Sequence, residues 1–142
     1  MTLTLNTART IIAATREHAS SAGFKPMTVV VLDGGGHVVA VEREDGSSNK
    51  RFEIAYGKAH GAISLGMGSR SLMSRAEQQS YFIAAVTSAV GGALVPVPGG
   101  VLVRDGSGEL LGAVGVTGDS SDNDEAAAIV GIESAGLMPQ PE

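Results

Sequence analysis

The stretch from Val97 to Gly136, VPGGVLVRDGSGELLGAVGVTGDSSDNDEAAAIVGIESAG, decides the fold because it encodes two strands and a helix in close succession. Residues 101–116 contain two apolar runs, and the Asp-Gly-Ser-Gly sequence between them is typical of a turn. The serines and aspartate after Gly118 are typical helix caps, and the charges of Asp124 and Glu125 suit the first turn of a helix. The segment therefore predicts an antiparallel hairpin followed by a helix.

The rest of the chain predicts a second hairpin and three further helical segments, within one domain spanning residues 1–142. In chain order we first expect a helix over residues 5–22, a hairpin over 27–43 with an Asp-Gly-Gly-Gly turn, and a helix over 52–66. Helical sequence over 70–90 and a short edge strand at 93–95 follow. The hairpin and helix described above come next, and a loose tail begins at Pro139. The strands come in hairpins, which favours an α+β fold of order α-β-β-α-α-β-β-β-α with a mainly antiparallel sheet.

The composition predicts a thin core that gains from association between copies of the chain. Hydrophobic residues make up 43% of the 142 residues, but aromatic residues only 4%, and glycine occurs 20 times. The core must therefore be built from Val, Ile, Leu and Ala at close approach. We expect a homo-oligomer, because self-association would add buried surface.

Charge and cysteine content exclude several classes of function. The net charge is −5 and the basic residues are scattered, so nucleic acid is not an expected partner. The chain has no cysteine, which excludes thiol catalysis and cysteine-based metal sites. No apolar run reaches the length of a membrane span, and no secretory signal pattern is present, so we expect a cytoplasmic protein that does not enter membranes.

Three segments together resemble the GlcG/HbpS-like family, also called the haem-degrading-domain family. They are VVVLDGGGHVVAVEREDG at residues 29–46, AYGKA at residues 55–59, and the segment from Pro98 to Gly136. The resemblance implies a profilin-like fold with a five-stranded antiparallel sheet flanked by helices, frequent homo-oligomers, and tetrapyrrole binding in some members. Relatives include proteins encoded in catabolic operons and the C-terminal domain of PduO-type cobalamin adenosyltransferases. Glu44 and His60 depart from the family's usual sequence.

The resemblance makes haem a candidate ligand, and the chain has three histidines that could supply an axial nitrogen. His18 lies beside the apolar stripe of the first helix, His37 follows the glycine-rich turn, and His60 lies in the second helix. For each of them an ordinary structural role is the alternative. Their spacing matches no familiar set of metal ligands, so we expect no dedicated metal site.

A polar cluster around the second helix is the second candidate site. Arg43 and Asp45 end a strand, and Arg51 and Lys58 follow on the next helix, so together they could hold a carboxylate or a haem propionate. A local network of salt bridges is the alternative. The free amides at Gly99 and Gly100 could add a small anion nest at the rim of a pocket. The glycines of the turn at residues 34–36 join two strands and are not a phosphate loop.

The acidic start of the last helix offers a third possibility. If Lys58 lay buried near Glu125, both pKa values would shift and proton transfer would become feasible. Asp122 and Asp124 are further candidate acids, with helix capping as the alternative.

Three functions follow from these candidates. The favoured one is a homo-oligomer that binds haem, another tetrapyrrole or a small carboxylated metabolite. The first alternative is a cofactor-free catabolic enzyme that uses Lys58 and Glu125 for isomerisation or elimination on a small oxygenated acid. The second alternative is a structural or regulatory oligomer.

Overall fold

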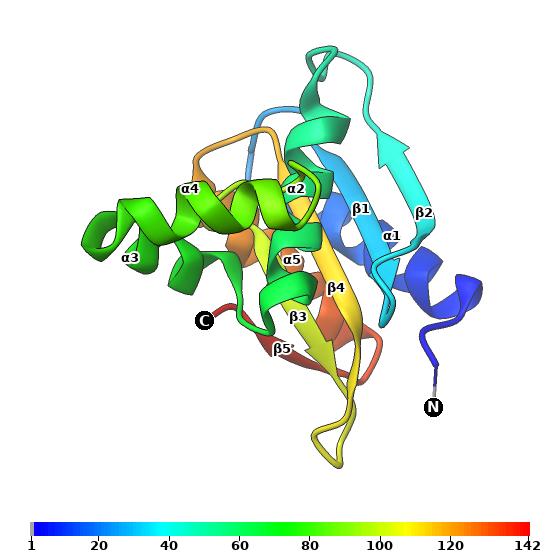
Figure 1. Cartoon of the computed structure of the whole chain (residues 1–142). Helices are drawn as coiled ribbons and strands as arrows, with labels where there is room; N and C mark the ends of the chain where they lie inside the picture. The colour runs from blue at the N-terminus through cyan, green and yellow to red at the C-terminus, as the bar shows by residue number, and fades with distance from the viewer. Residues whose placement is uncertain (1) are drawn as a thin grey trace.

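The two hairpins lie in one five-stranded antiparallel sheet, as Figure 1 shows for the computed structural model, which describes residues 2–142. The first hairpin consists of β1 (Thr28–Asp33) and β2 (Val38–Arg43), and the second of β3 (Gly100–Arg104) and β4 (Leu110–Thr117). β1 also pairs with β4, which joins the hairpins and gives the strand order β2-β1-β4-β3-β5. The predicted α+β fold with a five-stranded antiparallel sheet is confirmed.

Helices cover both faces of this sheet. One face packs against α1 (Leu5–Ser21) and α5 (Ser121–Ser134), and the other packs against α2 (Arg51–Leu65). Because side chains alternate along a strand, Val29 of β1 belongs to the first core and its neighbour Val30 to the second. The strands β1, β3 and β4 are buried on both sides, which explains their continuous apolar runs, whereas the edge strand β2 is mostly exposed.

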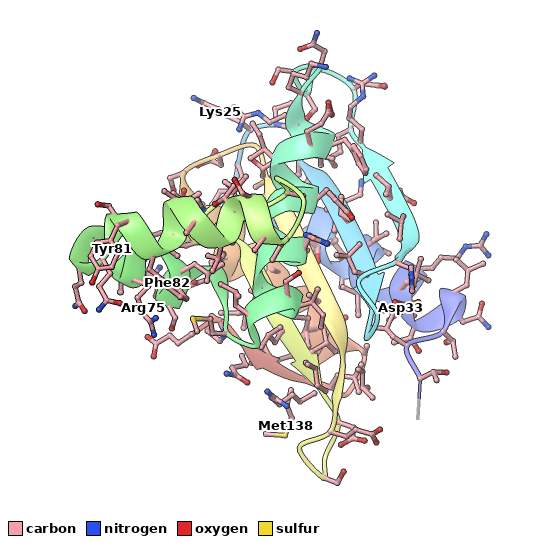
Figure 2. The ribbon with its side chains drawn as sticks, viewed as in Figure 1. Lys25, Asp33, Arg75, Tyr81, Phe82 and Met138 are labelled. Carbon is pink, nitrogen blue, oxygen red and sulfur yellow. The ribbon has the colours of Figure 1, made fainter. Side chains whose placement is uncertain are left out.

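The helical sequence over residues 70–90 forms two helices, α3 (Ser69–Gln78) and α4 (Ser80–Ala89), where the pattern predicts one stretch. The chain bends at Gln79, whose φ of −141° and ψ of 64° leave the helical region. The guanidinium of Arg75 lies 5.0 Å from the ring centre of Phe82 and packs across the bend. Figure 2 shows this pair of helices standing away from the sheet, with Tyr81 at the outside. Within residues 2–142, no helix has the length and apolar character needed to cross a bilayer.

The fifth strand is β5 (Met138–Gln140), not the predicted edge strand at residues 93–95. The 93–95 segment has no strand pairing, because it lies over α2, where Val95 N donates to Gly57 O at 3.1 Å. β5 pairs with β3 alone, so it is an edge strand and tolerates Pro139 opposite Val103. The tail expected to be loose is therefore part of the sheet.

Candidate functional site

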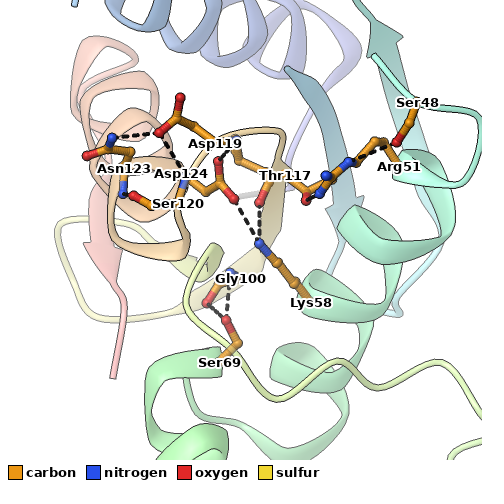
Figure 3. A network of polar contacts seen from close by, with 11 residues as sticks. Ser48, Arg51, Lys58, Ser69, Gly100, Thr117, Asp119, Ser120, Asn123 and Asp124 are labelled. Atoms are coloured by element: carbon orange, nitrogen blue, oxygen red, sulfur yellow. Dashed lines mark hydrogen bonds and ion pairs between the residues drawn. The ribbon is translucent and has the colours of Figure 1, made fainter. Parts of the chain in front are cut away.

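A buried ion pair lies where α2, β4 and α5 meet. Lys58 of α2 lies with its Nζ 3.1 Å from Asp124 Oδ2, and each side chain is only 2% exposed. The same ammonium donates to the carbonyl of Val116 at 2.9 Å. Figure 3 shows that Lys58 reaches this point from the opposite side to Asp124. Burial lowers the pKa of Lys58 and raises the pKa of Asp124, while their mutual attraction opposes both shifts.

The second carboxylate oxygen of Asp124 is held by the loop that leads into α5. Asp119 N donates to Asp124 Oδ1 at 2.9 Å, and the side chain of Ser120 caps the helix by accepting from Asn123 N. Asp119 in turn accepts hydrogen bonds from the amides of Lys25 and Ser120. These amide bonds lower the pKa of Asp119 to about 2. The loop is thus fixed by bonds that need both carboxylates ionised.

The two glycines at the start of β3 allow Lys58 to pack closely against the strand. A Cβ atom at Gly99 would lie 2.8 Å from Lys58 Nζ, and one at Gly100 would clash with the Lys58 carbonyl oxygen. Gly100 N donates to Ser69 Oγ at 2.7 Å. The Gly100 amide is therefore already used inside the protein, and the role of these buried glycines is close packing.

The predicted cluster of Arg43, Asp45, Arg51 and Lys58 does not form one site. Arg43 donates to the carbonyl of Ser47 at 2.9 Å, while Lys58 lies in the buried pair. Asp45 is exposed. Arg51 borders a small cavity with a volume of about 200 Å³, and Asp45 borders a different one with a volume of about 330 Å³.

Lys58 and Glu125 do not face each other. Glu125 binds Arg70 of α3, with Arg70 Nε 3.0 Å from Glu125 Oε2, and Asp122 binds the same guanidinium. This arrangement ties α3 to α5. Lys58 is paired with Asp124 and Glu125 with Arg70, so the two groups expected to exchange protons with each other have separate partners.

The three histidines lie in different surroundings. His37 is 81% exposed and lies 3.2 Å from Asp33 Oδ1. His60 is half-buried, its Nδ1 lies 2.8 Å from the carbonyl oxygen of Ala93, and its ring stacks on Tyr56 at 5.1 Å. His18 is also half-buried and borders a cavity of about 260 Å³ between α1 and α5. Within residues 2–142, no group of three or more histidine, cysteine, aspartate or glutamate side chains is placed to hold a metal ion.

A further cavity has a volume of about 530 Å³ and lies at the end of the sheet beside the β1–β2 turn. The carboxylates of Asp33 and Glu109 line it, together with the backbone of Gly34 and Gly35. This cavity is acidic, whereas the one beside Arg51 is lined by basic and neutral groups.

Sequence reasoning missed Ser69, Arg70, Thr117 and Asp119 as members of these networks. Asp119 had a usable signal, because an aspartate just before two serines at a helix start is typical of a capped loop. Ser69 and Arg70 had none, since their partners are 31 and 55 residues away in the sequence.

The fold is that of an α+β protein with one antiparallel sheet between helices, and its polar networks gather at the start of α5. The family model described as "Haem degrading protein HbpS-like" matches residues 3–133, so the chain belongs to the HbpS-like family. A comparison with curated proteins finds no match.

Solved structures share the fold of this chain. The PduOC:heme complex has a TM-score of 0.85 and 22% identity, over 96% of this chain and 97% of that chain. Klebsiella pneumoniae protein ORFY has a TM-score of 0.83 and 22% identity, over 94% and 90%. A double mutant of Streptomyces reticuli HbpS has a TM-score of 0.79 and 28% identity, over 94% and 86%.

Proposed function

We propose that this protein binds haem or another tetrapyrrole through the imidazole of His18, and that it does so as a homo-oligomer. Membership of the HbpS-like family supports the ligand class, and so does the similarity to a domain crystallised with heme. The observation that carries the choice of residue is that His18 borders a groove lined also by Ala14, Glu17, Ser21 and Val130, and that neither of its ring nitrogens has a hydrogen-bond partner within residues 2–142.

The groove beside His18 suits one face of a macrocycle. Ala14 of α1 and Val130 of α5 form its apolar wall, and the ring of Phe24 meets His18 edge-on with ring centres 5.8 Å apart. This contact restricts the imidazole orientation without using a nitrogen atom. A neutral imidazole with a free lone pair is the usual nitrogen donor to haem iron.

The other histidines are less suited to an axial bond. The ring of His37 is 81% exposed, so no apolar wall covers it, and its Nδ1 already lies 3.2 Å from Asp33 Oδ1. His60 donates its Nδ1 proton to the Ala93 carbonyl, which leaves Nε2 free for iron, but its ring is covered on one side by Tyr56. His60 retains a free Nε2, so it is the second choice.

Two features support an oligomer. A cavity of about 260 Å³ is below the range of about 300–1,000 Å³ typical of closed small-molecule sites, so one chain would cover haem only partly. The sequence of α4, SYFIAAVTSA, has no charged residue, yet Ile83 is its only fully buried side chain and Tyr81 is 72% exposed. A second copy packed on α4 would bury this apolar helix.

Titration with hemin tests the haem proposal. The protein should give a saturable shift of the Soret band, and His18→Ala should weaken binding or change the spectrum, whereas His37→Ala should change neither. The far-UV circular dichroism of each variant reports whether it is folded. A Soret shift that is unaffected by His18→Ala would overturn the assignment of this residue, and an absence of saturable binding would overturn the haem proposal.

The oligomer is tested separately by light scattering at several protein concentrations. Tyr81→Glu places a charge on the exposed side of α4 and should shift the protein towards the monomer. The same change at another exposed position, Val38→Glu on β2, provides a control. A wild-type protein that is monomeric at all concentrations contradicts the proposal.

A further inference from the structure

A basic cavity lies at the end of the molecule where α2 begins. It has a volume of about 200 Å³ and is separate from the groove beside His18, because the two share no lining residue. Its lining includes two cations and two hydroxyl groups and no carboxylate; the residues are Lys25, Pro26, Gly46, Ser47, Ser48, Arg51 and Gly118. Lys25 is labelled at this end of the molecule in Figure 2.

Arg51 is the positioned cation of this cavity. Its Nε donates to Ser48 Oγ at 3.1 Å and its Nη1 donates to Thr117 Oγ1 at 2.9 Å, as Figure 3 shows. Within residues 2–142 no carboxylate lies within ion-pair distance of this guanidinium. A guanidinium carries five N–H donors, so most of its capacity for hydrogen bonds is left for a ligand. Arg70, by contrast, binds two carboxylates.

The charges around Arg51 do not balance. Asp124 is the buried carboxylate nearest to Lys58, and that single negative charge faces the ammonium of Lys58. The positive charge of Arg51 is close enough to contribute to lowering the pKa of Lys58, after the larger effect of burial. Asp119 is near Lys25, but its carboxylate oxygens are occupied by the amides of Lys25 and Ser120 and by the side chain of Asn123. An added anion would therefore relieve repulsion between two cations.

The wall of the cavity is held in place before any ligand arrives. Ser47 is fixed from two sides, since its Oγ lies 2.8 Å from Thr28 Oγ1 and its carbonyl accepts from Arg43. Gly46 adopts a φ of +87°, and a Cβ there would approach Pro26 to 3.3 Å. The start of α2 lacks a side-chain cap, and the acidic residue of its first turn is Glu53, which does not line the cavity.

We propose that this cavity binds a small oxyanion, carried on a carboxylate or a phosphate, through the guanidinium of Arg51 with support from Lys25 and Ser48. A guanidinium with unused N–H groups binds such anions through charge-assisted hydrogen bonds. The volume limits the ligand to a small molecule. This site does not depend on haem binding at His18, and either proposal can fail without the other.

Acetate serves as the probe for a carboxylate ligand, and inorganic phosphate serves as the probe for a phosphate ligand. Each is titrated at constant ionic strength, with chloride as the balancing salt, while the amide resonances of Ser48 and Gly118 are followed by NMR. We expect saturable shifts at these amides. Arg51→Gln should weaken binding by about tenfold or more, because it removes hydrogen bonds to a charged group. Arg9→Gln, the same change at an exposed arginine of α1, should leave binding unchanged.

The outcomes separate the alternatives. Tighter binding of acetate identifies a carboxylate site, and tighter binding of phosphate identifies a phosphate site; both support the proposal. Shifts that do not saturate, or equal loss in the Arg51→Gln and Arg9→Gln proteins, would overturn it. The Soret titration of Arg51→Gln with hemin should match that of wild type, which keeps this test independent of the haem proposal.

Discussion

The ammonium of Lys58 and the carboxylate of Asp124 meet 3.1 Å apart at the end of β4 and join helices that lie on opposite faces of the sheet. α2 and α5 cannot touch through the sheet, so this pair and its neighbours hold the two layers in register. Burial of both groups is costly, and their mutual attraction offsets part of that cost. The pair is therefore a structural element that ties α2 to α5.

Removing one partner of this pair should be strongly destabilising. Lys58→Met leaves Asp124 as an uncompensated buried charge, and we expect the free energy of unfolding to fall by about 3–5 kcal/mol. Urea denaturation at neutral pH measures the change. The double variant Lys58→Met with Asp124→Leu removes both charges and should recover most of the loss.

An exposed ion pair provides the matched control. Lys50 and Glu53 lie 3.4 Å apart with side chains that are 76% and 51% exposed. Lys50→Met should change the free energy of unfolding by less than about 1 kcal/mol. Equal effects of Lys50→Met and Lys58→Met would mean that the buried pair contributes no more than a surface contact.

Asp119 should make stability depend on acidic pH. The amide of Lys25, followed by other donors, holds the pKa of Asp119 at about 2 in the folded protein, below the unfolded value of about 3.9. A lowered folded pKa gives stability that is present above the unfolded pKa and is lost as the pH falls through the folded pKa. Between about pH 4 and about pH 2, the wild type should therefore lose stability more steeply than Asp119→Asn.

The pH effect is measured by chemical denaturation at a series of pH values, and by NMR titration of the Asp119 carboxyl carbon. A carboxyl that titrates at the ordinary value for aspartate, or equal slopes in the two proteins, would contradict the prediction. The acid-dependent loss should be accompanied by loosening of the loop before α5, because Asp119 also holds the side chain of Asn123.

The sequence predicts the hairpins and the sheet because turn chemistry and apolar strands are local signals. The buried pair also had a periodic signal. Asp124 lies on the same helical face as the buried residues Ala127, Ala128 and Gly131, and Lys58 lies among the buried alanines of α2. A charged residue on a face of small apolar residues indicates a buried partner, but its identity depends on how the two helices meet across the sheet.

Other features had no local signal. β5 was missed because two prolines normally argue against a strand, and only pairing at the edge makes Pro139 acceptable. The residues of the polar cluster expected around Arg51 bind different partners in the folded protein. Arg43 donates to the Ser47 carbonyl, whereas Arg51 donates to Thr117, and which partner each one meets depends on how the loop before α2 folds. Contacts such as that of Arg70 with Glu125 depend on the position of α3, which the sequence pattern leaves open.

Thr15 offers a stabilising substitution. Its hydroxyl is fully buried between α1 and α5 and has no hydrogen-bond partner within residues 2–142. Thr15→Val keeps the branched shape and removes the unpaired oxygen, so we expect the free energy of unfolding to rise by about 1 kcal/mol. Thermal denaturation measures this. Thr10→Val, on the exposed side of α1, removes a hydroxyl that bonds Asn6 O and should give no increase. A loss of stability in Thr15→Val would indicate a hydrogen bond to the hydroxyl.

The C-terminal strand should be needed for a stable and soluble fold. A chain that ends after Gly136 lacks β5, which exposes the edge of β3 and removes the bond from Arg104 Nε to Gln140 Oε1. It also removes Leu137, which packs against the core. We expect a loss of about 1–3 kcal/mol in the free energy of unfolding and a tendency to aggregate through the open edge.

Urea denaturation and light scattering test this, with a shorter truncation after Gln140 as the control. The control keeps the three paired residues of β5, so it should lie much closer to the full chain in stability and solubility. Because Pro141 packs against Gly68 at the start of α3, the control should show a small loss confined to α3 and α4, visible as faster amide hydrogen exchange there. Equal stability of the full chain and the chain ending at Gly136 would show that the sheet is complete without its fifth strand.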